Sequence, residues 1–453
     1  MQPFLVNQNR RISDNPIREL VHSYGSRTGA LFLAHIPLAL LMLNYPFIAI
    51  FHALFTLAVG IITASSTRRL ERTVYVAAYI TGAEVLWRMT QQWLFWEYGK
   101  YAVTAVFFVS ILRMLRRKEQ LLPFLYFLLL IPSTALILGH NLDALRQDIS
   151  FNLSGPFSLM ISCLFFSRVN LTKENIRRTL IALVMPITGI AAIVIYKILT
   201  AQVILFQSSS MMETSGGFGP NQVSAILGLA ALSIYLIYLL CGKFNLRQRV
   251  LMIAGIIYFA SQSALTFSRT GVAIASASAL LAFLFLIRNT QTRLKIILTV
   301  AIFAFIANYY IFPRLQLFTG GAILMRFTDT SSTGRADIFK ADLEIWKNHL
   351  IFGVGPGQAR FHRSKYYKKK AAAHTEFSRL VAEHGVYGFV AFLLLLTMGF
   401  NYLRNANSLK SKGLIASLTG WSYLFLLGSA MRLVAPSFLF GLASARIFIE
   451  DNE

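Results

Sequence analysis

Two stretches, TLIALVMPITGIAAIVIY at residues 179–196 and GVAIASASALLAFLFLI at residues 271–287, indicate the solvent in which this chain folds. Each is close to the ~17–25 apolar residues that a membrane-spanning helix needs. Similar runs recur along the 453 residues, of which 56% are hydrophobic and 14% charged. Soluble globular chains carry about 25% charged residues, and the mean hydropathy here is +0.58. The sequence therefore predicts an all-α polytopic membrane protein.

The net charge of +24 could suggest a nucleic-acid partner, but the placement of the basic residues argues for a membrane topology instead. Short basic clusters such as RMLRRK (113–118) and KFNLRQR (243–249) fall at alternate connections between apolar runs. The intervening connections, such as 91–99 and 198–220, contain no Lys or Arg. This is the positive-inside pattern, which predicts that the basic loops are cytoplasmic. We expect membrane lipids, and no nucleic acid, around this chain.

Pairing the apolar runs with this charge pattern predicts about fourteen transmembrane helices, with both termini in the cytoplasm. Twelve remain possible, because the fourth and sixth runs are short and RLVAPS (432–437) could turn the last pair into one irregular hairpin. The predicted spans are residues 28–44, 46–64, 73–90, 100–114, 121–139, 155–168, 179–197, 222–240, 250–267, 271–287, 296–312, 385–402, 414–430 and 437–449.

The chain is accordingly divided into four parts. Residues 1–27 form a polar cytoplasmic segment with no early apolar core, so a removable signal peptide is not expected. Residues 28–312 carry transmembrane helices 1–11. Residues 313–384 form one large periplasmic loop. Residues 385–453 carry transmembrane helices 12–14 and a short cytoplasmic C-terminus.

The loop 313–384 holds 12 Lys or Arg residues against six Asp or Glu residues. Loops longer than ~60 residues largely escape the positive-inside rule, so a basic loop can lie outside. Its pattern predicts an amphipathic helix capped by Ser332 or Thr333, a turn at FGVGPG (352–357), and a second amphipathic helix that ends at Gly385. GVGPG lacks the Lys-Ser/Thr ending of a nucleotide loop, which favours a plain tight turn.

Three residues at the outer side are candidates for chemistry. His374 can accept a proton from a hydroxyl near neutral pH, and we expect it in the first turn of its helix, where the dipole favours the neutral ring. Arg269 lies in FSRTG between two apolar runs, where a charge is costly and often functional. Arg335 begins the first loop helix, where its planar fork and the backbone amides suit phosphate oxygens. Each alone could equally be structural or a surface residue.

Two further residues are possible substrate ligands. Asn221, in GGFGPN (216–221), could hydrogen-bond a ligand, although a plain loop end is the simpler interpretation. Arg379 lies one helical turn after His374, within a cluster that suits a scaffold at least as well as a binding site. Glu84 and Arg88, spaced i and i+4 within a predicted span, can neutralise each other, which favours a structural role.

The sequence also argues against several kinds of site. Cys163 and Cys241 are far apart within or at the edge of apolar runs, so neither a disulfide framework nor a metal site is expected. No Asp-x-Asp pair stands in a predicted outside loop, and no His/Cys cluster has metal-ligand spacing. We therefore expect no metal and no cofactor, which disfavours a transferase that uses nucleotide sugars.

Three segments in order, SRTG (268–271), STGRADIFKADLEIWKNHLIFGVGPG (332–357) and AHTEFSRLVAEHGVYGFVAFL (373–393), resemble the O-antigen ligase and polymerase family of bacterial membrane glycosyltransferases. The resemblance covers about residues 200–400. It implies a GT-C-like fold and a metal-independent enzyme that moves a glycan from undecaprenyl pyrophosphate to an acceptor hydroxyl at the periplasmic face of the inner membrane.

By motif match, the resemblance implies that Arg269 and Arg335 hold the pyrophosphate and that His374 acts as the base on the acceptor or orients it. Many members have asparagine after the histidine, whereas Thr375 follows here. This departure leaves the hydrogen-bonding partner of His374 open.

Three functions stay open. A polysaccharide polymerase, whose acceptor is another lipid-linked repeat, is the first choice because fourteen spans is long for a ligase. An O-antigen ligase would use a lipid A core sugar instead. A transporter or flippase of lipid-linked glycans is the alternative from another class, but transporters place ionisable groups near the midplane and show internal repeats, which this sequence lacks.

Overall fold

The computed structural model describes residues 16–66, 69–90, 94–114, 120–139, 141–207, 209–242, 244–288, 290–329, 334–366 and 373–450. The proposed caps Ser332 and Thr333, residues 1–15 and the lysines of 368–370 lie outside these ranges.

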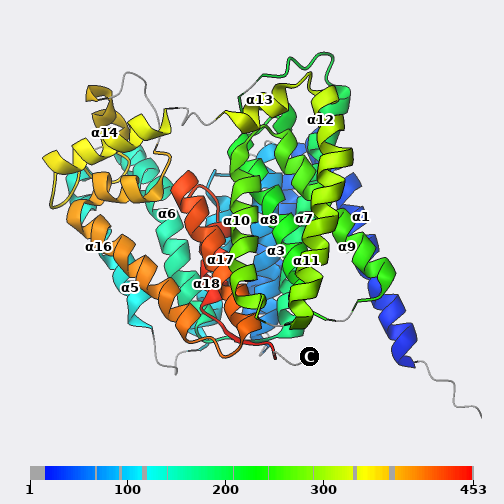
Figure 1. Cartoon of the computed structure of the whole chain (residues 1–453). Coiled ribbons are helices and arrows are strands. Elements are labelled where there is room, and N and C mark those ends of the chain that lie inside the picture. The colour runs from blue at the N-terminus through cyan, green and yellow to red at the C-terminus, as the bar shows by residue number, and fades with distance from the viewer. Residues whose placement is uncertain are drawn as a thin grey trace, which may run out of the picture.

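The described chain is a helical bundle (Figure 1). Its first part comprises α1 (Pro16–Asn44), α2 (Pro46–Ser66), α3 (Leu70–Met89), α4 (Tyr98–Leu112), α5 (Leu121–Leu128), η1 (Pro132–Ile137), α6 (Leu142–Phe166), β1 (Asn170–Thr172), α7 (Lys173–Thr200), η2 (Glu213–Ser215), α8 (Pro220–Leu240), α9 (Leu246–Leu265), α10 (Arg269–Leu286) and α11 (Thr290–Ile306).

The second part contains the long loop and the last helices. It comprises η3 (Ala307–Ile311), α12 (Phe312–Phe318), α13 (Ala322–Thr328), α14 (Arg335–Asn348), α15 (Ala359–His362), η4 (Arg363–Lys365), α16 (Glu376–Arg404), α17 (Leu409–Gly428), α18 (Ala435–Ala443) and β2 (Arg446–Phe448). In Figure 1, α14 lies beside α16 at one end of the bundle, and α13 lies at the same end above α10.

Seven helices among the described residues are long and apolar enough to cross a membrane. They are Pro46–Ser66, Leu142–Phe166, Lys173–Thr200, Glu213–Leu240, Arg269–Leu286, Ile296–Phe318 and Glu376–Arg404. This agrees with an all-α membrane protein, whereas the count of fourteen spans stays a prediction. Within the described ranges, the strands β1 and β2 form a short parallel pair, which meets at Leu171 and Ile447.

Two predicted spans differ from the structure. The run 121–139 is divided into α5, of 8 residues, and η1, which begins at Pro132; proline cannot continue the hydrogen-bond ladder of the preceding helix. The run 437–449 contains only the 9 residues of α18 before the chain turns into β2. At 1.5 Å per residue, each helix covers roughly half of a ~30 Å hydrocarbon core or less.

Glycines allow two of the helices, α8 and α10, to approach each other closely. A Cβ on Gly271 of α10 would stand 1.9 Å from the Ser224 carbonyl oxygen of α8, and one on Gly228 would stand 2.5 Å from the Gly271 oxygen. The hydroxyl of Ser224 accepts from the Gly271 amide at 3.1 Å. Small residues permit such backbone contact between helices in membranes. This contact fixes the start of α10, where Arg269 lies.

The loop has the predicted helix, turn, helix order. Gly385 has φ 61° and ψ −137°, which separates the first part of α16 from the longer apolar part. The glycine turn lies against this break, where Val354 N–H and Gly355 N–H donate to the carbonyls of Ala382 and Glu383, each at 3.0 Å. The GVGPG amides thus satisfy the open carbonyls at a helix end. This arrangement supports the tight-turn interpretation over a nucleotide loop.

We expect Gly271→Ala to lower the free energy of unfolding by about 1–3 kcal/mol, the usual cost of overpacking, since its Cβ has no room between α8 and α10. Thermal unfolding in detergent measures this effect. Gly139→Ala is the matched control, because no atom lies within 4 Å of its new Cβ. Equal melting temperatures for the two variants would contradict the packing argument.

Candidate active site

The SRTG motif forms a rigid turn at the start of α10. Ser268 is the N-cap, and its hydroxyl accepts from the Thr270 amide at 3.4 Å. The same hydroxyl donates to Asn221 Oδ1 at 2.7 Å, and the Thr270 hydroxyl lies 3.5 Å from that oxygen. Asn221, at the start of α8, therefore orients the turn that carries Arg269.

Arg326 joins this turn to the long loop. Its Nε–H donates to the carbonyl of Phe267 at 2.9 Å, and Phe267 has φ 55°, a conformation that a residue with a Cβ rarely adopts. Arg269 donates to the backbone carbonyl of Asp329, whose carboxylate lies 3.9 Å from the Arg326 Nη1. The loop segment after α13 is thus fastened to the SRTG motif.

Arg335 is the first residue of α14 and follows Gly334, which has φ 78°. Burial lowers the pKa of Arg335, and the positive charges of Arg269 and Arg326 lower it further. Three guanidinium groups from α10, α13 and α14 therefore share one region. Such a group of permanent cations with planar forks is suited to an anion with several oxygens, such as a diphosphate.

His374 is half-buried, and the charge of Arg335 acts on it. Burial lowers the pKa of His374 to about 4, with further contributions from the charges of Arg335, Arg432 and Arg363. The neutral imidazole that we expect is thus favoured. Its position differs slightly from the prediction: Thr375 is the N-cap of α16, so His374 lies one residue before the cap and outside the first turn.

Thr375, the residue that departs from the family motif, has a structural role. Its hydroxyl accepts from the Ser378 amide at 3.0 Å and donates to the Ser378 hydroxyl at 2.8 Å. Ser378 in turn donates to Asp342 Oδ2 at 2.6 Å, and Asp342 Oδ1 accepts from Arg363 Nε at 2.5 Å. Asp342 and Arg363 are fully buried. This chain of bonds fixes the backbone beside His374 against α14.

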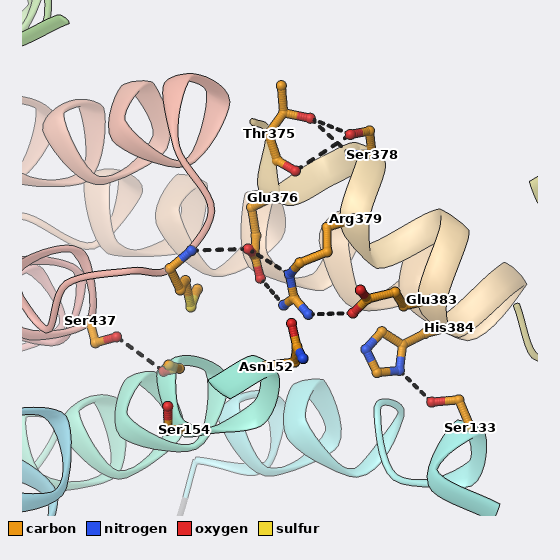
Figure 2. Close-up of polar contacts among 12 residues, drawn as sticks. Ser133, Asn152, Ser154, Thr375, Glu376, Ser378, Arg379, Glu383, His384 and Ser437 are labelled. Carbon is orange, nitrogen blue, oxygen red and sulfur yellow. Dashed lines mark hydrogen bonds and ion pairs between the residues drawn. The ribbon is translucent and has the colours of Figure 1, made fainter. Parts of the chain in front are cut away.

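Arg379 lies between two carboxylates (Figure 2). Its guanidinium bonds Glu376 on one side and Glu383 at 2.8 Å on the other, and all three side chains are buried. Glu376 Oε2 also accepts from the Met431 amide at 3.1 Å. Arg379 still lines a small cavity of about 180 Å³ with Arg363 and Arg432. The structural role of Arg379 is clear from these ion pairs, whereas its role in substrate binding stays a prediction.

Arg432 is a site residue that the sequence reasoning missed. It lies between α17 and α18, and its Nη2 donates to the Ala373 carbonyl, next to His374, at 3.1 Å. Its Nε–H is buried and has no hydrogen-bond partner among the described residues. This donor is available to hydrogen-bond a substrate oxygen beside His374. The sequence feature that could have identified Arg432 is its charge at the start of RLVAPS (432–437), a mostly apolar stretch.

The segment that carries Arg432 is held by the predicted pair Glu84 and Arg88. These side chains meet at 2.7 Å and are both 2% exposed, which confirms their pairing. Arg88 Nη1 donates to the Arg432 carbonyl at 2.8 Å, and Glu84 Oε2 accepts from the Val434 amide at 2.7 Å. The pair therefore connects α3 to the site.

The structure thus brings His374, Arg335 and Arg269 into one cationic region, with Asn221 orienting the turn of Arg269. It adds Arg326, Arg363 and Arg432 to that region. Within the described ranges, no group of three His, Cys, Asp or Glu side chains could hold a metal ion.

Residues 255–393 match the family model described as O-antigen ligase. The match contains all three motifs on which the resemblance was based, and it supports assignment of this segment to the O-antigen ligase and polymerase family. No curated protein matches the chain. With the seven apolar helices, the match indicates a bacterial membrane protein with a glycosyltransferase-like site.

Arg379→Ala should lower the free energy of unfolding by about 3–5 kcal/mol, because it leaves two buried carboxylates without their partner. The melting temperature in detergent measures the loss. The control is the triple variant E376Q/R379M/E383Q, which removes all three charges together and should regain much of the stability. A triple variant that folds but binds no substrate would show that this cluster of charged residues acts in binding.

Proposed function

We propose that this protein is a metal-independent glycosyltransferase that takes a glycan from undecaprenyl pyrophosphate and joins it to an acceptor hydroxyl at the periplasmic face of the inner membrane. The observation that carries the proposal is a neutral histidine beside a group of arginines, within a segment that matches the O-antigen ligase family.

The arginines would hold the pyrophosphate. When the bond between the sugar anomeric carbon and the phosphate oxygen breaks, both bonding electrons stay with the pyrophosphate, and negative charge grows there. Arg269, Arg326 and Arg335 supply fixed positive charge at that point, which stabilises a transition state without rearrangement. Each guanidinium has five N–H donors, so it can keep its backbone contact and still bind a phosphate oxygen.

His374 would take the proton of the acceptor hydroxyl while the acceptor oxygen bonds to the anomeric carbon. With a pKa of about 4 in the free protein, the ring is neutral at physiological pH and able to accept. A bound pyrophosphate would offset the arginine charges that depress this pKa, which would make His374 a stronger base only when the donor is present.

An apolar cavity near the arginines suits the carrier lipid. It has a volume of about 740 Å³ and lies among α8, α9, α10 and α11. Its lining includes Ser263 and Val272, close in sequence to Arg269, and Ile297 and Val300 of α11, which are 53% and 55% exposed. An isoprenoid tail could enter sideways past α11 while its pyrophosphate lies at the arginines.

The acceptor decides between the two functions of this class. We propose a polymerase, whose acceptor is another lipid-linked repeat. The ligase, whose acceptor is a lipid A core sugar, is the second candidate, because the matching family is described as O-antigen ligase. The count of fourteen spans that favours a polymerase stays a prediction beside the seven apolar helices of the described residues.

Purified protein incubated with lipid-linked oligosaccharide alone should lengthen the glycan, as seen by gel analysis of the products. His374→Ala should slow this reaction by about 10²–10⁴-fold, the usual contribution of a general base. Growth that requires added lipid A core would favour the ligase. If His374→Ala kept full transfer but lost glycan flux across vesicle membranes, the result would favour the flippase and contradict the enzyme proposal.

The pH profile gives a second test of His374. Because protonation removes the base, kcat/KM should be flat near neutrality and fall as pH drops through about 4, the pKa of His374 in the free protein. His374→Gln should lack this acidic limb. A limb that persists unchanged in the glutamine variant would assign it to another group.

Filling the apolar cavity should weaken donor binding. Ala279→Trp places a ring among its lining residues, and the donor KM should rise by roughly tenfold, equivalent to about two methylene groups at ~0.8 kcal/mol each. Ala273→Trp is the control, because Ala273 is exposed on the same helix and does not line the cavity. Equal KM values would place the tail elsewhere.

A further inference from the structure

The proposed donor site does not use a second cavity. This cavity has a volume of about 970 Å³ and lies where α3 and α7 end and α8 begins. Its wall combines apolar side chains such as Leu43 and Met89 with the polar groups Arg88, Lys197, Glu213 and Gln222. A mainly apolar pocket with a few polar groups is the usual form of a binding site for a small ligand.

The cavity shares a wall with the candidate active site. Arg88 donates to Gln222 Oε1 at 3.1 Å on the cavity wall and to the Arg432 carbonyl at 2.8 Å. Arg432 then donates to the Ala373 carbonyl, one residue from His374. Arg88 and Arg432, which are joined by a hydrogen bond, would therefore lie between a ligand in the cavity and His374.

The same wall also borders the region of the pyrophosphate arginines. Asn221, next to Gln222 at the start of α8, accepts from Ser268 of the SRTG motif. The apolar cavity described above lies along later residues of α8, such as Gly228 and Tyr235, against α9, α10 and α11. The two cavities thus adjoin different parts of α8, which leaves the larger one available to a second substrate.

The chemistry of the rim fits a saccharide. The rings of Trp96 and Phe218 lie 5.7 Å apart at an interplanar angle of 38°, and Trp96 is 46% exposed. Sugar rings carry apolar C–H faces that pack on aromatic rings, and hydroxyls that both donate and accept hydrogen bonds. Exposed Glu213 and Lys197 and the Gln222 amide offer acceptors and donors of both kinds.

We propose that this cavity binds sugar residues of the acceptor glycan that lie behind its reacting sugar, while the reacting hydroxyl lies at His374, on the other side of Arg88 and Arg432. The inference rests on the proposed glycosyltransferase function and specifies where its second substrate lies. Either acceptor, a lipid-linked repeat or a lipid A core, is attached to a membrane lipid, and the apolar wall formed by Leu43, Met89 and Leu94 suits the membrane side of such a molecule.

Single-cysteine labelling tests this site, because the native Cys163 and Cys241 are both buried. Met212 lines the cavity and is 60% exposed, so Met212→Cys can carry a fluorescein maleimide. Labelled Met212→Cys should raise the acceptor KM by roughly tenfold or more, since a filled pocket loses ground-state binding. Val203→Cys, at a position that is 75% exposed and does not line the cavity, should label without this effect.

Protection from labelling identifies the ligand. Free repeat-unit oligosaccharide, released from the carrier by mild acid, or delipidated core oligosaccharide should slow the labelling of Met212→Cys and leave Val203→Cys unchanged. Undecaprenyl pyrophosphate without sugar should protect neither. Protection by the sugar-free lipid alone, or by none of the three probes, would overturn the acceptor site.

The His374→Ala variant distinguishes failure of the acceptor site from failure of the proposed function. If this variant loses transfer but labelled Met212→Cys keeps a normal acceptor KM, the acceptor site is wrong and the proposed function stands. If His374→Ala transfers glycan normally, the proposed function fails, whatever the labelling shows.

Discussion

The buried ion pair between Glu84 and Arg88 is the contact on which the site depends. Two charges within a helical bundle are stable only when further hydrogen bonds compensate for their lost water. Here those bonds come from the backbone of Arg432 and Val434 and from Gln222. The pair therefore holds the link between α17 and α18 against α3, and that link carries Arg432 to His374.

The cationic region requires such anchoring because like charges repel. Arg269, Arg326, Arg335, Arg363 and Arg432 all act on one another or on His374. Several are fixed by acceptors in the same framework: the Phe267 and Asp329 carbonyls and the Asp342 carboxylate. The fold thus stabilises an arrangement of positive charge that an anionic ligand would stabilise further. Fixed positive charge of this kind stabilises an anion without rearrangement of the protein.

Much of the site could be predicted from local patterns. The spacing of apolar residues predicted the loop helices, glycine at 385 predicted the break in α16, and the i, i+4 spacing predicted the Glu84–Arg88 pair. The sequence could not predict that Thr375 caps a helix linked to Asp342, or that Arg432 lies beside His374. Those contacts join residues 36 and 59 positions apart, and periodicity carries no signal at that range.

By itself, the sequence determined the solvent and the class of this protein, because membrane helices must be apolar over a fixed length, and it singled out His374, Arg269 and Arg335 by residue type. Only the tertiary structure decided which of the other arginines lie in the cationic region and which, like Arg379, are neutralised by carboxylates. It also decided that the apolar runs 121–139 and 437–449 become short helices. The physical reason is that charge compensation and helix termination depend on neighbours brought together by folding.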